Sequence, residues 1–169
     1  SEEVKRAMMR MITFAEKRVY LQTPYFVPDR SIVESLKMAV QSGVDVRIMI
    51  PHMPDHIFVY WATYSYVGEL LRSGARAFIY DDGFLHAKTL VVDGEVCTVG
   101  STNFDNRSFR LNFETNAFIF DSDFASQMEA AFLHDMTRHG HELTYEDYKR
   151  RGLLIRVKEA FSRLLSDIL

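Results

Sequence analysis

Disulfide bonds within the chain are excluded, because its 169 residues include a single cysteine, Cys97. Cys97 lies in GEVCTVG among β-branched residues, so we interpret it as a buried structural thiol rather than a nucleophile. The sequence also lacks a signal-peptide pattern and any apolar run near the ~18–20 residues that a membrane-spanning helix needs. We therefore expect the chain as given to be soluble. A helical pattern starts directly at Ser1, and we expect a piece of a longer protein.

An excess of one charge sign is missing as well. The chain has 20 basic and 23 acidic residues, a net charge of −3, so no global field attracts nucleic acid or an anionic membrane. A local cationic pocket remains compatible with this total. Hydrophobic residues make up 47% and charged residues 25%, as in ordinary globular proteins. We predict one domain, residues 1–169, large enough to bury a real core.

Helical and strand patterns alternate along the chain. Ser31 and Glu34 fit a capping box, and the Asp93-Gly94 pair between two strand patterns is a strong hairpin signal. The order predicts an α/β fold, with a mixed β-sheet flanked by helices on both faces. The expected helices are 1–17, 31–43, 55–74 and 122–140, with two short helices from 143 onward, and the expected strands are 19–26, 44–50, 75–82, 86–93, 95–101 and 113–121.

The predicted hairpin gathers five polar side chains at one end of the sheet. Residues i and i+2 of a strand share a face, so we expect His86 and Lys88 to point the same way. Ser101 and Asn103 share a face on the far side of the hairpin by the same rule. Glu114 begins the next strand and is within reach of the same end. The five residues are therefore candidates for one site.

These residue types suit chemistry at phosphorus. A neutral imidazole attacks phosphorus to form a covalent intermediate, and Lys, Asn and Ser donors stabilise phosphoryl oxygens that gain charge. A carboxylate on the other ring nitrogen fixes the tautomer. The spacing of His134, His139 and His141 matches no strong metal-ligand pattern, and we expect neither metal nor cofactor. The spacing alone does not exclude that this H-x-K pattern occurs by chance. Asp93 has the opposite parity and favours a structural role in the turn.

Longer segments resemble a known family. HAKTLVVD fits the H-x-K-x4-D motif of the phospholipase D superfamily, and GSTNFD fits the G-[ST]-x-N that follows it. TPYFVPD, GVDVRIMIP, GFLHAK and DNRSFRLNFE are similar to the C-terminal portion of bacterial cardiolipin synthases. The resemblance covers the chain from about Tyr20 to its C-terminus and implies a phospholipase D-like α/β sandwich, one half of a two-motif enzyme.

The resemblance also implies roles for the site residues. His86 matches the motif histidine, which is either the phosphohistidine nucleophile or the general acid. Lys88 and Asn103 match phosphate-binding residues, with Ser101 an extra donor, and Glu114 matches the carboxylate that orients the histidine. Asp93 matches the motif aspartate, usually regarded as structural. Members of this family work without metal.

The implied activity is a phosphatidyltransferase that forms cardiolipin and glycerol from two phosphatidylglycerols at the bacterial cytoplasmic membrane. Members use two motifs facing each other, whereas this chain has one, so a complete site needs the missing half or a symmetric dimer. One alternative is a phosphodiesterase that hydrolyses phospholipid or nucleic acid, although the charge and the lack of an aromatic-basic stripe argue against nucleic acid. The other is a catalytically incomplete half-domain that binds lipid.

Further segments offer candidate contacts to substrate, each with a plainer alternative. Tyr25, His52, Arg107 and Arg110 are candidates for substrate binding, against packing, helix capping or surface ion pairing. The basic amphipathic tail, about 144–169, has an apolar stripe that suits an anionic membrane surface. We favour the alternative that this stripe packs on the chain's own core or on the missing half. The stripe consists of Leu154, Val157, Phe161, Leu164, Leu165 and Ile168.

Overall fold

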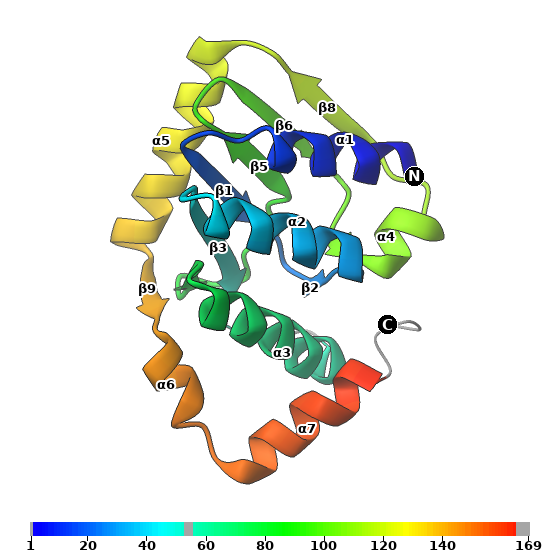
Figure 1. Ribbon diagram of the computed structural model, residues 1–169, viewed down its shortest axis with the longest axis vertical. Helices are drawn as coiled ribbons and strands as arrows, with labels where there is room; N and C mark the ends of the chain where they lie inside the picture. The colour runs from blue at the N-terminus through cyan, green and yellow to red at the C-terminus, as the bar shows by residue number, and fades with distance from the viewer. Residues whose placement is uncertain (1, 53–55, 165–169) are drawn as a thin grey trace.

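The computed structural model describes residues 2–52 and 56–164, except the side chain of residue 153, and Figure 1 shows their arrangement. A seven-stranded sheet in the order β8-β6-β5-β1-β3-β4-β9 forms the centre, and β2 and β7 form a separate pair. The strands are β1 (Arg18–Gln22), β2 (Phe26–Val27), β3 (Asp45–Pro51), β4 (Arg76–Tyr80), β5 (Thr89–Val92), β6 (Val96–Gly100), β7 (Phe104–Asp105), β8 (Asn116–Ile119) and β9 (Gly140–Leu143). The helices are α1 (Glu2–Thr13), α2 (Arg30–Gln41), α3 (Ile57–Ser73), α4 (Asn106–Arg110), α5 (Ser122–Arg138), α6 (Tyr145–Lys149) and α7 (Leu153–Leu164).

The large sheet is mixed, as predicted. Strands β1, β3 and β4 are parallel, because α2 and α3 return the chain to the same starting edge. Strands β5, β6 and β8 run antiparallel to their neighbours on one side, and β9 does so on the other. The β5–β6 hairpin turns at Asp93 and Gly94, which have φ values of 57° and 69°. Positive φ at both central residues is what a tight hairpin turn requires, so this prediction is confirmed.

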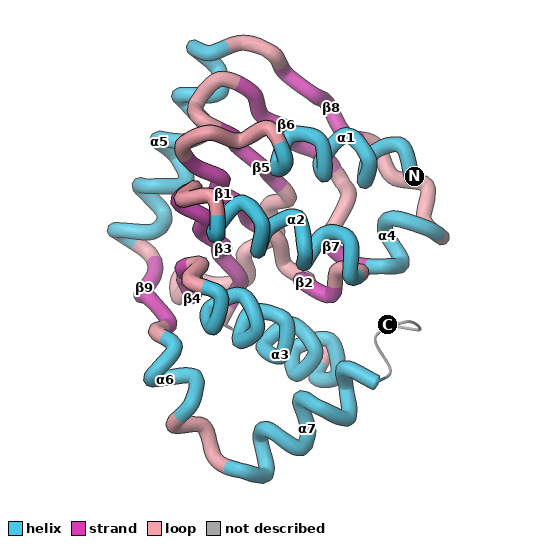
Figure 2. Tube along the Cα trace, viewed as in Figure 1, coloured by secondary structure: helices cyan, strands magenta, loops and turns pink. Residues whose placement is uncertain are grey.

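Helices cover both faces of the sheet, which confirms the predicted fold class. Helices α1, α2 and α3 cover one face, and α5 lies on the other, as Figure 2 shows. Alternate residues of β1 separate the two layers: Val19 and Leu21 belong to the core under α1–α3, whereas Tyr20 stacks on Phe132 of α5 at 4.9 Å between ring centroids. The period-2 pattern of the strands is therefore buried on both sides.

The predicted strand 19–26 is wrong in its second half. Strand β1 ends at Gln22, and the Thr23 hydroxyl donates to the carbonyl oxygen of Tyr25, which turns the chain out of the sheet. Phe26 then pairs with Phe104 in the small β2–β7 sheet. The turn separates the two segments and places Tyr25 at the edge of the large sheet.

Among the other boundaries that differ from the sequence patterns, two have a clear physical cause. The capping box at Ser31 is wrong, because Asp29 is the N-cap of α2 and accepts from the amides of Ser31 and Ile32. Helix α5 ends at Arg138, not at Gly140, and the chain continues as β9. Strand β9 is short and polar, and it pairs with β4 at an edge where only one neighbour is needed, so its composition gave no strand pattern.

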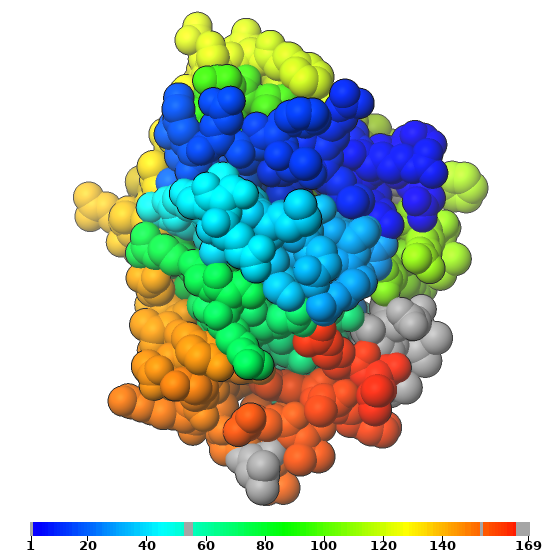
Figure 3. Space-filling model, viewed as in Figure 1, coloured from blue at the N-terminus to red at the C-terminus, as the bar shows by residue number. Residues whose placement is uncertain are grey.

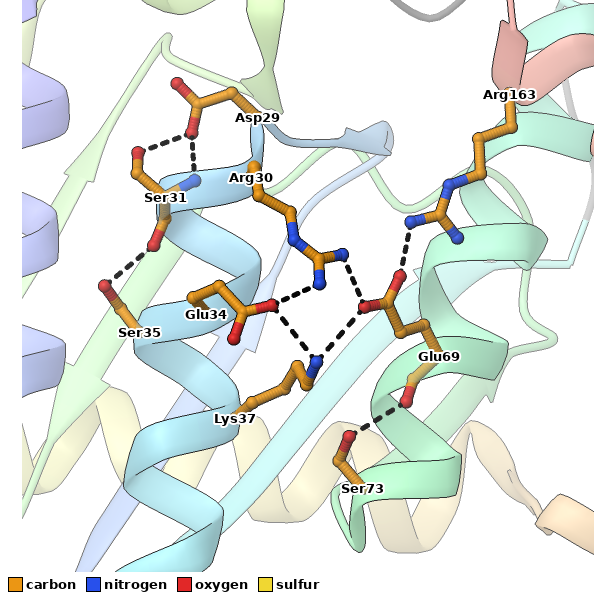
Figure 4. A network of polar contacts seen from close by, with 9 residues as sticks. All are labelled: Asp29, Arg30, Ser31, Glu34, Ser35, Lys37, Glu69, Ser73 and Arg163. Carbon is orange, nitrogen blue, oxygen red and sulfur yellow. Dashed lines mark hydrogen bonds and ion pairs between the residues drawn. The ribbon is translucent and has the colours of Figure 1, made fainter.

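The C-terminal helix α7 packs on α3 at the surface, at the lower edge of the space-filling view in Figure 3. The Arg163 side chain of α7 reaches Glu69 of α3, which also pairs with Arg30 and Lys37 of α2, as Figure 4 shows. One carboxylate thus ties three helices together through three cations. Leu165 and Ile168 of the predicted apolar stripe lie outside the described residues.

Candidate active site

The candidate site lies at the carboxyl edge of the parallel strands β1, β3 and β4. In open α/β sheets this edge commonly holds the ligand site. The open end of the β5–β6 hairpin adds two more segments here, since Thr89 pairs with Val99 and the amide of Gly100 donates to the carbonyl oxygen of Lys88 at 3.3 Å. His86 and Lys88 therefore lie next to Ser101 and the residues that follow it.

His86 and Lys88 precede β5 rather than belonging to it, so the expected shared strand face is wrong. The Lys88 amine instead turns back and donates to the carbonyl oxygen of His86 at 2.8 Å. The His86 side chain is exposed, and its ring lies 5.7 Å from the ring of Phe84. The lysine is held against the histidine backbone while the imidazole remains open to a substrate.

Lys88 is a buried cation, with only 7% of its surface exposed. Burial lowers its pKa from the usual 10.5, while the charges of Glu114 and Asp105 oppose this change. The two carboxylates thus stabilise the charged ammonium, but by less than burial destabilises it, so the pKa of Lys88 stays below its usual value. A buried ammonium of this kind gains strongly from an anionic ligand.

Glu114 lies just before β8 and organises the polar side chains around the hairpin end. It accepts hydrogen bonds from the hydroxyls of Ser101 and Ser108 and from the amide of Asn112. Among the described residues, no hydrogen bond joins Glu114 to the His86 ring. Its expected role in orienting the histidine stays a prediction, whereas its contact with Ser101 brings two of the five candidates together.

Asn103 and Asp105 face one another beyond the hairpin. The Asn103 side chain hydrogen-bonds to Asp105, but its own oxygen Oδ1 is buried without a hydrogen-bond partner, as is the hydroxyl of Thr102. Asp105 is the N-cap of α4 and accepts from the amide of Ser108 at 2.7 Å. Burial raises the pKa of Asp105, against the lowering effect of these bonds. Unsatisfied buried polar atoms are rare and often mark functional sites.

A pocket of about 220 Å³ opens beside Asn103. His56, the N-cap residue of α3, lines it and lies 6.4 Å from the Tyr25 ring, centroid to centroid. Both residues also line a second, narrow pocket with Phe84, the neighbour of His86. The lining residues of the larger pocket are Tyr25, Val27, His56, Val59, Asn103, Asp105, Arg107 and Asn112.

The other substrate-binding candidates separate into two groups. Tyr25 and Arg107 line the pocket, as a substrate contact requires. His52 is exposed, with its Nδ1 3.8 Å from Asp81 Oδ1, and Arg110 Nε lies 3.9 Å from Glu2 Oε1 of α1. The sequence left His56, beside His52 in PHMPDH, open between helix capping and a lining of the substrate entrance, whereas Asp105 and Asn112 were missed. The position of His56 directly before a helical pattern at the end of a strand was a usable signal.

Asp93 lies at the opposite end of the hairpin and serves the fold. Its carboxylate accepts from the backbone amides of Glu16, Lys17 and Arg18 at 2.9, 2.8 and 2.7 Å. Burial raises its pKa, but these three bonds and the charge of Lys17 lower it more, so the pKa lies below the usual 3.8. The carboxylate fixes the connection between α1 and β1 to the turn.

The two histidines that follow α5 contact carboxylates. The Nδ1 atoms of His139 and His141 lie 2.5 and 2.6 Å from the carboxylates of Asp82 and Asp81. Across residues 2–52 and 56–164, no group of three or more His, Cys, Asp or Glu side chains has the geometry to hold a metal ion. Nor does any described helix have the length and apolarity to cross a bilayer.

Comparison with known proteins identifies the family of the chain. Residues 8–136 match the protein family described as "Cardiolipin synthase, PLD-like domain". A cardiolipin synthase of Listeria monocytogenes is 56% identical over 168 residues, which are 99% of this chain and 35% of that protein. The chain therefore spans about a third of the length of this curated relative.

Two solved structures share the fold at low sequence identity. Phosphatidylserine synthase of Haemophilus influenzae matches with a TM-score of 0.78 at 18% identity, over 99% of this chain and 45% of that chain. Nuc of Salmonella typhimurium, a phospholipase D family member, matches with a TM-score of 0.71 at 22% identity, over 83% of this chain and 90% of that chain. The same fold thus forms nearly all of one protein and less than half of another.

Proposed function

The chain belongs to the phospholipase D-like domain family of cardiolipin synthases, and we propose that it supplies one of two catalytic halves of a phosphatidyltransferase. The reaction forms cardiolipin and glycerol from two phosphatidylglycerols through a phosphohistidine intermediate. The observation that carries this proposal is the buried Lys88 ammonium held against exposed His86, with Asn103 nearby at the pocket. Because phosphatidylglycerol is a membrane lipid, the complete protein works at the bacterial cytoplasmic membrane.

The first half-reaction breaks a phosphorus–oxygen bond. An imidazole nitrogen attacks the phosphorus of phosphatidylglycerol, a phosphorus–nitrogen bond forms, and the glycerol oxygen leaves with a proton donated by a second histidine. Lys88 and the amide nitrogen of Asn103 stabilise the phosphoryl oxygens as charge develops on them. His86 is either the nucleophile that attacks phosphorus or the general acid that protonates the leaving oxygen.

The second half-reaction regenerates the histidine. The free hydroxyl of a second phosphatidylglycerol gives its proton to the other histidine and attacks phosphorus, and the phosphorus–nitrogen bond breaks to release cardiolipin. Tyr25, His56 and Arg107 line the pocket next to Asn103, and we assign them to the headgroup in place of His52 and Arg110.

The second histidine comes from outside this chain. The chain spans 35% of its Listeria relative, and its fold fills 45% of a phosphatidylserine synthase, so there is room for a second copy of the fold in longer proteins. The rest of the complete protein therefore supplies the facing motif. A symmetric dimer of this chain is the alternative source, and the mass of the isolated chain by sedimentation equilibrium distinguishes the two.

The test is product analysis with the complete two-motif protein and phosphatidylglycerol vesicles. We expect cardiolipin and glycerol in equal amounts, unchanged by EDTA, and a loss of at least about 10³-fold for His86→Ala. His134→Ala, at an exposed histidine of α5, is the matched control and retains activity. Absence of cardiolipin from the wild-type protein would refute the proposed substrate.

Hydrolysis is the second candidate, because the fold also matches Nuc, a phospholipase D family member whose chain is nearly covered by this fold. In that case water resolves the phosphohistidine. The same assay then yields phosphatidate and glycerol without cardiolipin.

A further inference from the structure

Helix α7 buries polar side chains and exposes its apolar side, the opposite of what is usual for a helix that packs on a protein core. Its polar residues Glu159 and Ser162 are 3% and 1% exposed. Its large apolar residues are exposed, at 79% for Leu154, 58% for Val157, 57% for Phe161 and 82% for Leu164. Spacings of three, four and three place these four on one side of the helix, and we call them the apolar stripe. The expectation that the stripe packs on the chain's own core is wrong for the described residues.

Polar contacts hold α7 in this orientation. Glu159 accepts from the Tyr148 hydroxyl at 2.8 Å and pairs with Arg151, whose guanidinium lies 4.2 Å from the Tyr64 ring centroid. Arg163 pairs with Glu69 further along α3, as Figure 4 shows. Since a buried carboxylate needs these partners, rotating the helix to bury the stripe would break them. The outward position of the stripe is therefore fixed by the chain itself.

Positive charge is concentrated around the stripe. Residues 149–164 include six basic residues and one acidic residue, a net charge of +5, which leaves −8 for the other residues of the chain. Two of the six, Arg151 and Arg163, pair with Glu159 and Glu69. Arg156 and Lys158 of α7 are both exposed. Leu164 of the stripe also lines a groove of about 550 Å³ together with Arg156 and Arg163. Cations thus border the exposed apolar surface on an otherwise acidic molecule.

We infer that α7 is an interfacial helix that lies flat on an anionic phospholipid surface. The stripe enters the boundary between headgroups and acyl chains, and the flanking cations contact lipid phosphates. A protein partner fits less well, because an anionic bilayer complements the positive charge along the whole border of the stripe. This inference rests on the proposed function in one respect, that the substrate is an anionic membrane lipid.

Vesicle binding by the full 169-residue chain tests the inference. The single tryptophan, Trp61, is a built-in reporter, because the Lys158 ammonium lies 5.5 Å from its ring centroid. We expect binding to vesicles of phosphatidylglycerol and phosphatidylcholine, accompanied by a change in Trp61 fluorescence, and little binding to phosphatidylcholine alone. The double variant Leu154→Ser/Phe161→Ser should weaken the partition by at least about tenfold while its circular dichroism is unchanged.

A matched control uses exposed aromatic residues elsewhere. Phe14 and Phe120 are 68% and 82% exposed beside a different apolar groove, between α1 and β8. Phe14→Ser/Phe120→Ser should leave vesicle binding unchanged. Equal weakening by both double variants, or no binding of the wild-type chain, would overturn the inference. A wild-type dimer that dissociates in the stripe variant, without vesicle binding, would make the stripe a protein interface instead and overturn it as well.

Two further arms separate this inference from the proposed reaction. His86→Ala should bind phosphatidylglycerol vesicles as tightly as the wild type, because α7 does not use the reaction site. Vesicles of phosphatidylserine and phosphatidylcholine should bind the chain about as well, since charge rather than the glycerol headgroup is recognised. Binding that persists while the complete protein forms no cardiolipin would refute the proposed function and leave the membrane surface standing.

Discussion

The two ends of the β5–β6 hairpin carry residues of one motif and treat their polar groups in opposite ways. At the turn, the Asp93 carboxylate accepts three backbone amides within 2.9 Å, and its pKa is below the usual value. At the open end, Lys88 is a buried cation whose pKa burial lowers, and Asn103 Oδ1 is buried without a partner. At the turn, the protein itself supplies the hydrogen-bond partners of the polar group. At the open end, a cation is buried and a polar atom has no hydrogen-bond partner.

This difference separates structure from function without any knowledge of the reaction. A fully bonded carboxylate stabilises the native state, whereas a buried cation and an unpaired amide oxygen cost stability unless a ligand compensates them. Proteins retain such costs where chemistry needs them. The open end of the hairpin therefore has the properties of a ligand-binding site, whereas Asp93 at the turn has a structural role.

Lys88→Met gives the largest expected effect and tests the open end. Removing the ammonium should reduce cardiolipin formation by about 10²–10³-fold, because the developing phosphoryl charge loses its buried cation. The lowered pKa means that the burial penalty is present at neutral pH and fades only as pH rises toward 10.5. Hence the same variant should raise the melting temperature by roughly 2 °C.

Calorimetry and product analysis of the same preparation check both halves of this prediction. Lys149→Met, at an exposed lysine of α6 whose ion pair with Glu146 lies at the surface, is the control and should change neither quantity appreciably. A Lys88→Met protein that is both inactive and less stable would place Lys88 among the structural residues and erase the contrast between the ends.

Asp93→Ala tests the structural role of the turn and gives the next largest effect. The variant loses three hydrogen bonds from backbone amides, and alanine tolerates φ near 57° less well than aspartate does. Together these losses should lower the free energy of unfolding by about 3 kcal/mol. Because the pKa is depressed, the charge contributes fully above the usual 3.8 and is lost as pH falls below it. Urea titrations should therefore show the stabilities of wild type and Asp93→Asn converging below about pH 3.8. A constant difference at all pH values would exclude the carboxylate charge as the cause.

His56→Gln, compared with His52→Gln, gives the smallest effect and sharpens the outline of the site. His56 lines the pocket beside Asn103, so its loss should raise KM for phosphatidylglycerol by roughly tenfold. His52 faces Asp81 at the surface, and its substitution should alter KM by less than about twofold. Steady-state kinetics of the two variants decide the assignment, and the reverse order would restore His52 to the site.

Patterns of single elements predicted the fold well, and contacts between elements account for what was missed. The Asp-Gly turn was predictable because few residues tolerate positive φ. The relative placement of His52 and His56 was not, since it depends on how the segment after β3 meets the start of α3. The parity rule failed for His86 and Lys88 because both precede the strand, although their sequence still identified them as candidates. The reversed burial of α7 depends on Glu69 and Tyr148, residues that its own amphipathic pattern does not include.

The bonds of Asp93 also have a consequence for the order in which the protein is made. They join residues separated by 75 to 77 positions, and β5, the partner of the central strand β1, is synthesised equally late. At ribosomal rates of about 5–20 residues per second, β1 waits roughly 4–15 s for this partner. During that interval the nascent chain exposes one edge of its innermost strand. Chaperones that shield strand edges would therefore be needed most while residues 45–90 are being translated.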